Sequence, residues 1–141
     1  MKKDIVYSET APKAIGPYSQ GVRVGQTVYL SGQLPMDPEI MEMVTESFEA
    51  QAVQVFENLK AVAEAAGATL ENIINMTTLL SDMVYFSQLN EVMSGYFSEP
   101  FPARAAFAVK ALPKKFRYRN HDDSGNRVSE HKTWPDPQLL K

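Results

Sequence analysis

The chain has 141 residues, a formal net charge of −3, 44% hydrophobic residues and no cysteine. This length fits one domain, and no stretch approaches the roughly 20 consecutive apolar residues of a membrane-spanning helix. The lack of cysteine excludes disulfides, thiolate nucleophiles and cysteine-based metal sites. We therefore expect a globular cytoplasmic protein whose chemistry uses other groups.

Charge and histidine are unevenly distributed along the chain. Residues 1–113 carry 7 Lys and Arg against 13 Asp and Glu, a net charge of −6, whereas residues 114–141 carry 7 against 4, a net charge of +3. Both histidines, His121 and His131, lie in the basic segment. Chemistry in the acidic part must therefore use Arg, Tyr, Ser, Thr, carboxylates, backbone groups or water. Its acidity also disfavours nucleic acid as a partner.

The first predicted element is a β-hairpin. Two β-rich runs, Gln20–Val24 and Thr27–Ser31, flank a two-residue turn that begins with Gly25. Glycine supplies the positive φ that such turns require. Pro35 and Pro38 then interrupt the alternating pattern. Met36, Met41 and Met43 lack the Cys or His partners of a soft-metal site, so we expect this stretch to fold back as a loop.

Two helices and two strands follow the hairpin. Apolar residues at steps of three and four predict the first helix, with Thr45 or Ser47 as its cap and Gly67 after its end. β-branched runs predict the strands. The expected elements are a helix over Ser47–Ala66, a strand over Ile73–Leu80, a second helix from Ser81 or Asp82 to about Phe97, and a strand over Ala105–Leu112.

The order ββαβαβ predicts an α+β domain with two helices on one face of a mixed sheet. The opposite face needs a cover as well, because several positions expected there are apolar or small: Val28, Leu30, Ala105, Phe107 and Val109. We expect a homo-oligomer that closes sheet on sheet. The alternative is an open, half-polar face.

Arg104 is the first candidate for a functional residue. It follows Pro100-Phe101-Pro102-Ala103, a stiff approach that fixes its backbone, and it precedes a strand. A planar guanidinium in such a setting suits bidentate capture of a carboxylate. The alternative is a structural ion pair with one of the 13 acidic side chains.

Two further candidates lie near the predicted hairpin. Tyr18 follows Pro17 and places a phenol beside a sheet edge, although tyrosines there commonly serve only packing. Gly32 ends a strand and lets a ligand approach backbone groups, or it marks a bulge or turn. Ser31 is disfavoured as a nucleophile, because no histidine base occurs in residues 1–113 and no lysine lies nearby in sequence.

Four ordered motifs together carry a family resemblance. Residues Ala14–Gly21 (AIGPYSQG), Leu30–Pro35 (LSGQLP), Asn58–Val62 (NLKAV) and Pro102–Ala106 (PARAA) resemble the RidA-type reactive intermediate deaminases, the YjgF family, also called L-PSP endoribonucleases. The resemblance runs from about Ile5 to Lys114, so residues 1–114 are interpreted as a RidA-like domain. It implies a chorismate-mutase-like α+β fold, assembled as a homotrimer with ligand clefts between subunits.

The resemblance also implies an activity, the hydrolysis of 2-imino acids and their enamine tautomers to 2-keto acids and ammonia, with no bound cofactor or metal. Arg104 would clamp the substrate carboxylate. Backbone groups at Gly32 and Ala106 would position the imine nitrogen and the attacking water, while Tyr18 and Ser31 would line the cleft. The alternatives are a non-catalytic sensor of small keto acids and an RNA-acting translation inhibitor or endoribonuclease.

The end of the chain departs from the family. Members continue after the equivalent of Leu112-Pro113-Lys114 with a strand of the type Val-Glu-Ile-Glu-Ala-Ile-Ala, whose second Glu helps to activate water. Here residues 115–141 form a divergent basic tail, which we expect to be poorly ordered. If Tyr118–Gly125 is encoded TAC AGA AAT CAT GAT GAT AGC GGT, reading one base later gives Thr-Glu-Ile-Met-Met-Ile-Ala and then a Val codon. We hypothesise a one-base frameshift near Lys114–Phe116; the alternative is a genuine, divergent C-terminus.

Overall fold

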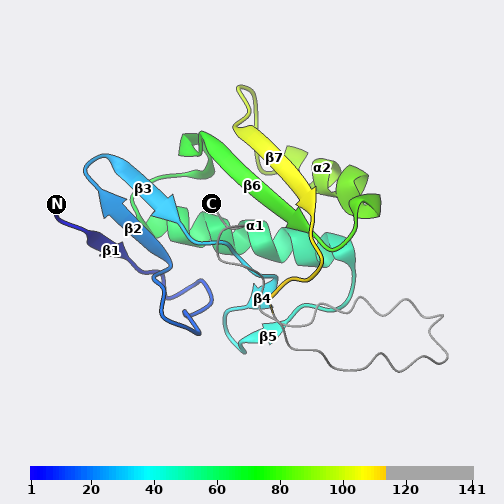
Figure 1. Ribbon diagram of the computed structural model, residues 1–141, viewed down its shortest axis with the longest axis horizontal. Helices are drawn as coiled ribbons and strands as arrows, with labels where there is room; N and C mark the ends of the chain where they lie inside the picture. The colour runs from blue at the N-terminus through cyan, green and yellow to red at the C-terminus, as the bar shows by residue number, and fades with distance from the viewer. Residues whose placement is uncertain (114–141) are drawn as a thin grey trace.

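The computed structural model describes residues 1–113, and its elements follow the expected order with three short strands added. The expectations for residues 115–141, including the frameshift, lie outside the described residues. The elements are β1 (Asp4–Val6), β2 (Gly21–Val24), β3 (Thr27–Leu30), β4 (Met36–Asp37), β5 (Glu42–Met43), α1 (Phe48–Ala65), a 3₁₀ turn (Leu70–Asn72), β6 (Asn75–Leu80), a second 3₁₀ turn (Met83–Tyr85), α2 (Phe86–Ser94) and β7 (Ala103–Ala108) (Figure 1).

Local rules explain the ends of the helices. The Ser47 hydroxyl oxygen accepts a hydrogen bond from the backbone N–H of Ala50 at 3.0 Å, which caps the start of α1. Gly67 has a φ of +75° just beyond the end of this helix, as expected. Before α2, the Asp82 carboxylate accepts from the N–H of Val84 at 2.9 Å, so the second helical segment begins with a 3₁₀ turn.

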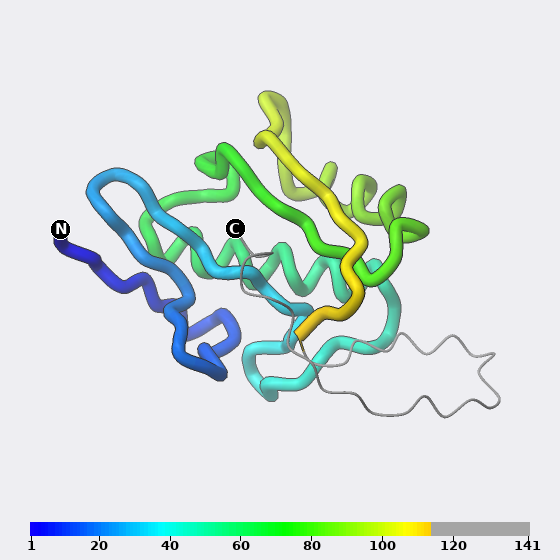
Figure 2. Tube along the Cα trace, viewed as in Figure 1, coloured from blue at the N-terminus to red at the C-terminus, as the bar shows by residue number. Residues whose placement is uncertain are grey.

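The strands form three small sheets. β1, β2 and β3 pair antiparallel in that order, β4 pairs antiparallel with β5, and β6 pairs parallel with β7. The fold-back expected around the methionines is the β4–β5 hairpin, in which Met36 lies opposite Met43 and is buried. The described chain begins at β1, and its last residues run from β7 toward the β4–β5 end of the molecule (Figure 2).

The expectation of one continuous mixed sheet is wrong for residues 1–113. Both β3 and β6 pack against α1, and their arrows run in the same direction in Figure 1. Each is paired on one edge only, β3 with β2 and β6 with β7, and within residues 1–113 no backbone hydrogen bond joins the two. A sheet is continuous only where neighbouring strands exchange such bonds. Two half-sheets therefore lie on one layer of helices, each with an unpaired edge.

Two buried clusters hold these half-sheets to the helices. One joins α1 to α2 and β6 through Phe56, Leu80, Leu89 and Met93, among others. The second joins the other end of α1 to the first sheet and contains Val6, Ala11, Val62 and Ala66, with Val28 and Leu30 packed against them. Both helices thus cover one face of the strands, as expected.

The face away from the helices is only partly the one that the sequence predicts. Val28 and Leu30 pack toward α1, so their expected outward orientation is wrong; alternation along β3 instead turns Tyr29 outward, where it is 66% exposed. Phe107, on the outward face of β7, is 55% exposed, as predicted. Ala105 shares its face by alternation, and Val109 beyond the strand is half-buried.

Candidate functional site

Arg104 lies on β7, and its side chain is held by one face of α2. Its Nη1 donates to Oδ1 of Asn90 at 2.7 Å and lies 3.3 Å from Sδ of Met93. Its Cζ is 5.1 Å from the centre of the Phe86 ring, a cation–π distance. Phe86, Asn90 and Met93 follow one another at steps of four and three, the spacing that brings side chains to one helix face.

The guanidinium of Arg104 has no carboxylate partner within residues 1–113. The only ion pair there joins Lys2 to Asp4 at 3.3 Å. The alternative that Arg104 serves a structural ion pair is therefore wrong for the described part of the chain. An arginine carries five N–H donors. Only Nη1 is used here, so the edge formed by Nε and Nη2 makes no hydrogen bond to residues 1–113. That edge has the fork geometry that matches a carboxylate.

Tyr18, Ser31 and Gly32 form a second group at the end of β3. The Ser31 hydroxyl donates to the carbonyl of Ser19 at 2.6 Å, and its backbone N–H donates to the carbonyl of Gln20 at 2.9 Å. These bonds hold the end of β3 against the segment that carries Tyr18, whose side chain is 48% exposed. The Ser31 proton is engaged by a carbonyl rather than by a base, which agrees with the expectation that Ser31 is no nucleophile.

The Gly32 backbone is open to solvent. The residue is exposed, and a Cβ added there would meet no atom within 4 Å. The fold itself therefore does not require glycine at this position. Ala106 lies two residues after Arg104 on the same face of β7, opposite Thr78 of β6. Accessible backbone groups are thus present at the β3 end, as a ligand-positioning role would require.

The structure keeps the two groups apart within residues 1–113. Arg104 and Ala106 lie on β7, which pairs only with β6, whereas Tyr18, Ser31 and Gly32 lie at the end of the sheet formed by β1, β2 and β3. No hydrogen bond of the described chain joins one group to the other. Within residues 1–113, neither strand pairing nor a hydrogen bond therefore joins the five expected site residues into one unit.

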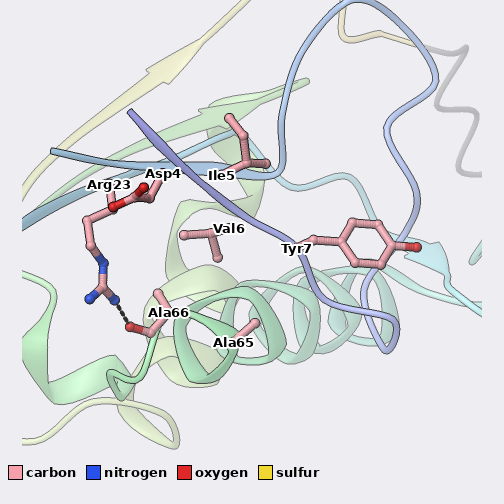
Figure 3. A pocket seen from close by; sticks show the side chains of 7 residues that line it. All are labelled: Asp4, Ile5, Val6, Tyr7, Arg23, Ala65 and Ala66. Carbon is pink, nitrogen blue, oxygen red and sulfur yellow. Dashed lines mark hydrogen bonds between the residues drawn. The ribbon is translucent and has the colours of Figure 1, made fainter. Parts of the chain in front are cut away.

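An open pocket of about 370 Å³ lies elsewhere, at the carboxyl end of α1. It is lined by Asp4, Ile5, Val6, Tyr7, Arg23, Ala65 and Ala66 (Figure 3). In this view the Arg23 guanidinium points at the carbonyl of Ala66, to which it donates a hydrogen bond. A cation at this end of a helix satisfies a free carbonyl and opposes the helix dipole. We interpret Arg23 as structural, and none of the expected site residues lines this pocket.

Sequence reasoning missed the three α2 residues that hold Arg104. In the sequence, Phe86 and Met93 fit the apolar stripe of an amphipathic helix, and Asn90 is one polar residue among several on that helix. The signal that the sequence offers is the spacing of these residues, four and then three positions apart on one helix face, shortly before an isolated arginine. No group of three His, Cys, Asp or Glu in the described range could hold a metal ion. Its helices are too short or too polar to cross a membrane.

Comparison with known proteins gives consistent matches. Residues 8–118 match the family model described as Endoribonuclease L-PSP. A 2-iminobutanoate/2-iminopropanoate deaminase of Bos taurus is 45% identical over 112 residues, which cover 79% of this chain and 82% of that protein. A RutC family protein of Pyrococcus abyssi is 46% identical over 114 residues, which cover 81% and 90%.

Solved structures show the same likeness. RidA from Psychrobacter sp. PAMC 21119 has 53% sequence identity and a TM-score of 0.76, with 79% of this chain and 89% of that chain covered. The structure of E. coli TdcF with bound serine has 39% identity and a TM-score of 0.74, with the same shares covered. The family model's match, residues 8–118, extends over the four motifs and over both groups of candidate residues. The chain belongs to the RidA/YjgF family, the Endoribonuclease L-PSP family of the matching model.

Proposed function

We propose that this protein hydrolyses reactive 2-imino acids and their enamine tautomers to 2-keto acids and ammonia, in clefts between the subunits of a homotrimer. Relatives from Bos taurus and Dermatophagoides farinae, 45% and 44% identical, are named 2-iminobutanoate/2-iminopropanoate deaminases. The proposal transfers that activity to this chain. The support for this transfer comes from the hydrogen-bonding of the Arg104 guanidinium.

The observation that carries the proposal is the free Nε–Nη2 edge of a half-buried arginine without an acidic partner in residues 1–113. Hydrogen bonds to charged groups contribute roughly 1.5–3 kcal/mol each, and bidentate contacts add geometric specificity. A 2-imino acid carries its carboxylate next to the reacting carbon. Binding that carboxylate at Arg104 therefore fixes the position of the carbon that water must attack.

The reaction requires little beyond positioning. Water adds to the imine carbon as the C=N electron pair moves to nitrogen, which gives a carbinolamine. Protonated nitrogen then leaves as ammonia while the hydroxyl loses its proton and the C=O bond forms. In the proposal, backbone groups at Gly32 and Ala106 orient the nitrogen and the water, and Tyr18 and Ser31 line the cleft. The described residues around Arg104 supply no carboxylate or imidazole.

Assembly would explain why one chain keeps its two groups of candidate residues apart. Large side chains remain exposed on the face away from the helices, among them Tyr29 and Phe107. An apolar face of this kind is typical of a subunit interface. In the proposed trimer this face is buried, and the β3 end of one subunit meets Arg104 of its neighbour.

The test measures ammonia and keto-acid release from 2-iminopropanoate generated in the cuvette, above the uncatalysed rate. We expect Arg104→Ala to abolish the protein-dependent rate. Arg104→Lys keeps the charge but loses the fork, so it should retain only a small part of the rate. The Glu91→Gln variant, which changes an exposed charge on α2, serves as the control. An unchanged rate in Arg104→Ala refutes the carboxylate clamp.

A specific observation favours a second candidate, a non-catalytic sensor of small carboxylates. The side chains that touch Arg104 are an amide, a thioether and a phenyl ring, none of which activates water at neutral pH. The solved structure of the TdcF relative holds serine, a small carboxylate. A sensor would bind 2-oxobutanoate through Arg104 without accelerating imine hydrolysis. Measuring binding and turnover on the same preparation separates the two functions.

A further inference from the structure

We propose that Asn90 is a positioning residue, which fixes the orientation of the Arg104 guanidinium while leaving its charge available to a ligand. The inference rests on the proposed carboxylate contact of Arg104. It goes beyond that contact, because it assigns to α2 the control of how strongly and in which orientation Arg104 binds an anion.

The geometry around Arg104 determines which of its edges is free. Asn90 accepts from Nη1 at 2.7 Å, Met93 Sδ lies 3.3 Å from the same nitrogen, and the Phe86 ring faces Cζ at 5.1 Å. The ring limits rotation out of the guanidinium plane, and the Asn90 bond limits rotation within it. All three contacts come from a single helix, so they move together. A carboxylate can then bind side-on, through Nε and Nη2.

The chemical identity of the Asn90 side chain matters because an acid would fit the same place. An aspartate has the same shape, but its carboxylate would pair with Arg104 at the distance at which the amide now lies. Such a pair would compete directly with an incoming carboxylate, since the intramolecular partner is always present. A neutral amide accepts one hydrogen bond and leaves the positive charge uncompensated within residues 1–113.

Asn90 is also well placed for substitution. Asn90 is exposed, so variants at this position should fold. Gln88 provides a matched control, because it is an exposed amide on the same helix two residues away, at a position that faces another side. Changing Gln88 to Glu alters the charge of α2 by the same amount as changing Asn90 to Asp.

The experiment titrates 2-oxobutanoate and its neutral amide, 2-oxobutanamide, into the full chain and the variants by calorimetry. We expect Asn90→Asp to weaken 2-oxobutanoate binding at least tenfold and to leave the weak amide binding unchanged, so the preference for the acid shrinks. Asn90→Ala should weaken 2-oxobutanoate binding about three- to tenfold, because the guanidinium is free to rotate. Gln88→Glu should change it less than twofold, and thermal midpoints should agree within about 2 °C.

Three results would overturn the inference in distinguishable ways. If Asn90→Asp and Asn90→Ala bind 2-oxobutanoate like Gln88→Glu while Arg104→Ala does not bind, Asn90 has no positioning role and the carboxylate clamp stands. If Arg104→Ala binds as tightly as the parent chain, the clamp itself fails and the inference fails with it. A loss of binding that accompanies a large fall in thermal midpoint in both Asn90 variants would show a structural role and also overturn the proposal.

Discussion

Gln20→Glu is a nearly isosteric change that should destabilise the segment carrying Tyr18. Gln20 is 4% exposed. Its Oε1 accepts from the N–H of Ser8 at 2.6 Å, while its Nε2 donates to the carbonyls of Ser8 at 3.1 Å and Pro12 at 2.9 Å. The amide thus fastens residues 8–12 to the start of β2. The same nitrogen lies 3.4 Å from the carbonyl oxygen of Ala11, so a carboxylate keeps the accepting oxygen but places a second oxygen against three carbonyls.

The expected cost at pH 7 follows from this hydrogen-bond inventory. The two shorter Nε2 hydrogen bonds contribute about 1 kcal/mol each, and the carbonyls left without this donor add a comparable penalty, so the sum is about 3–5 kcal/mol. Stabilities of single domains lie near 5–15 kcal/mol, so the loss is large. Burial and the facing carbonyls raise the pKa of the introduced carboxyl in the folded state. The penalty therefore grows as pH rises above the unfolded value of about 4.3.

Urea unfolding at pH 7 and pH 4, at one fixed protein concentration, measures this effect. The exposed Gln88→Glu is the control, with an expected change within about 0.5 kcal/mol. At pH 7 the free energy of unfolding of Gln20→Glu should lie well below that of the control. The difference between the two variants should be smaller at pH 4, because the protonated acid can donate one hydrogen bond. Equal free energies of unfolding for both variants at pH 7 would refute the role of the Nε2 donor.

Three further predictions concern other parts of the molecule. Burial and the hydrogen bond to Glu57 raise the pKa of Tyr96 to about 12. Between pH 10 and 12 the free energy of unfolding, measured from urea unfolding curves, should therefore fall more steeply in the parent chain than in Tyr96→Phe. Phe107→Glu places a charge on the exposed outer face and should shift the mass measured by light scattering toward one subunit, whereas Ile40→Glu in a loop should not. Replacing residues 118–125 by Thr-Glu-Ile-Met-Met-Ile-Ala-Val should raise the thermal midpoint and slow amide exchange along β3 and β6, unlike a version with Pro at the third and fifth places.

Elements governed by local rules could be predicted from the sequence. The cap at Ser47, the apolar stripe of α1 and the positive φ of Gly67 all depend on residues within one or two helical turns. The turn at Gly25, with a φ of +60°, depends on two residues between two strands. In these segments the conformation follows from nearest neighbours, so composition and spacing suffice.

Features that depend on distant partners could not be predicted in the same way. β1 is a strand only because Ile5 lies opposite Val22 of β2. β7 begins at Ala103 rather than Ala105, since its parallel register is set by Asn75 of β6. The face occupied by Val28 depends on the register of a whole strand, because a shift of one residue exchanges the two faces.

The candidate site shows the same division. Arg104 could be found from sequence, because a lone arginine after two prolines is a local signal. The hydrogen-bond partner of Arg104 could not be found in this way, because Asn90 and Arg104 are 14 residues apart and meet only where α2 packs against β7. The edges of β3 and β6 that stay unpaired within residues 1–113 are likewise a property of the arrangement, although the departure of residues 115–141 from the family pattern already pointed to a change at the last strand.

The environment of Arg104 also limits what chemistry the described residues can perform. A guanidinium that donates to an amide and has no acidic partner there binds anions but transfers no proton, because arginine stays protonated at all accessible pH values. For a 2-imino acid, anion binding of this kind supplies part of the catalysis, because the iminium carbon is already electrophilic and water is the nucleophile. Rate acceleration by Arg104 alone would then come from orientation and from stabilising charge, whereas a water-activating carboxylate would have to come from elsewhere. In the family that this chain resembles, such a carboxylate is the Glu at the fourth position of the last strand. The frame-shifted reading of residues 118–125 has Met at that position and its only Glu at the second. If the parent chain binds 2-oxobutanoate without turnover and the variant with residues 118–125 replaced gains turnover, the Glu at the second position supplies the acid; if both lack turnover, a Glu at the fourth position is required as well.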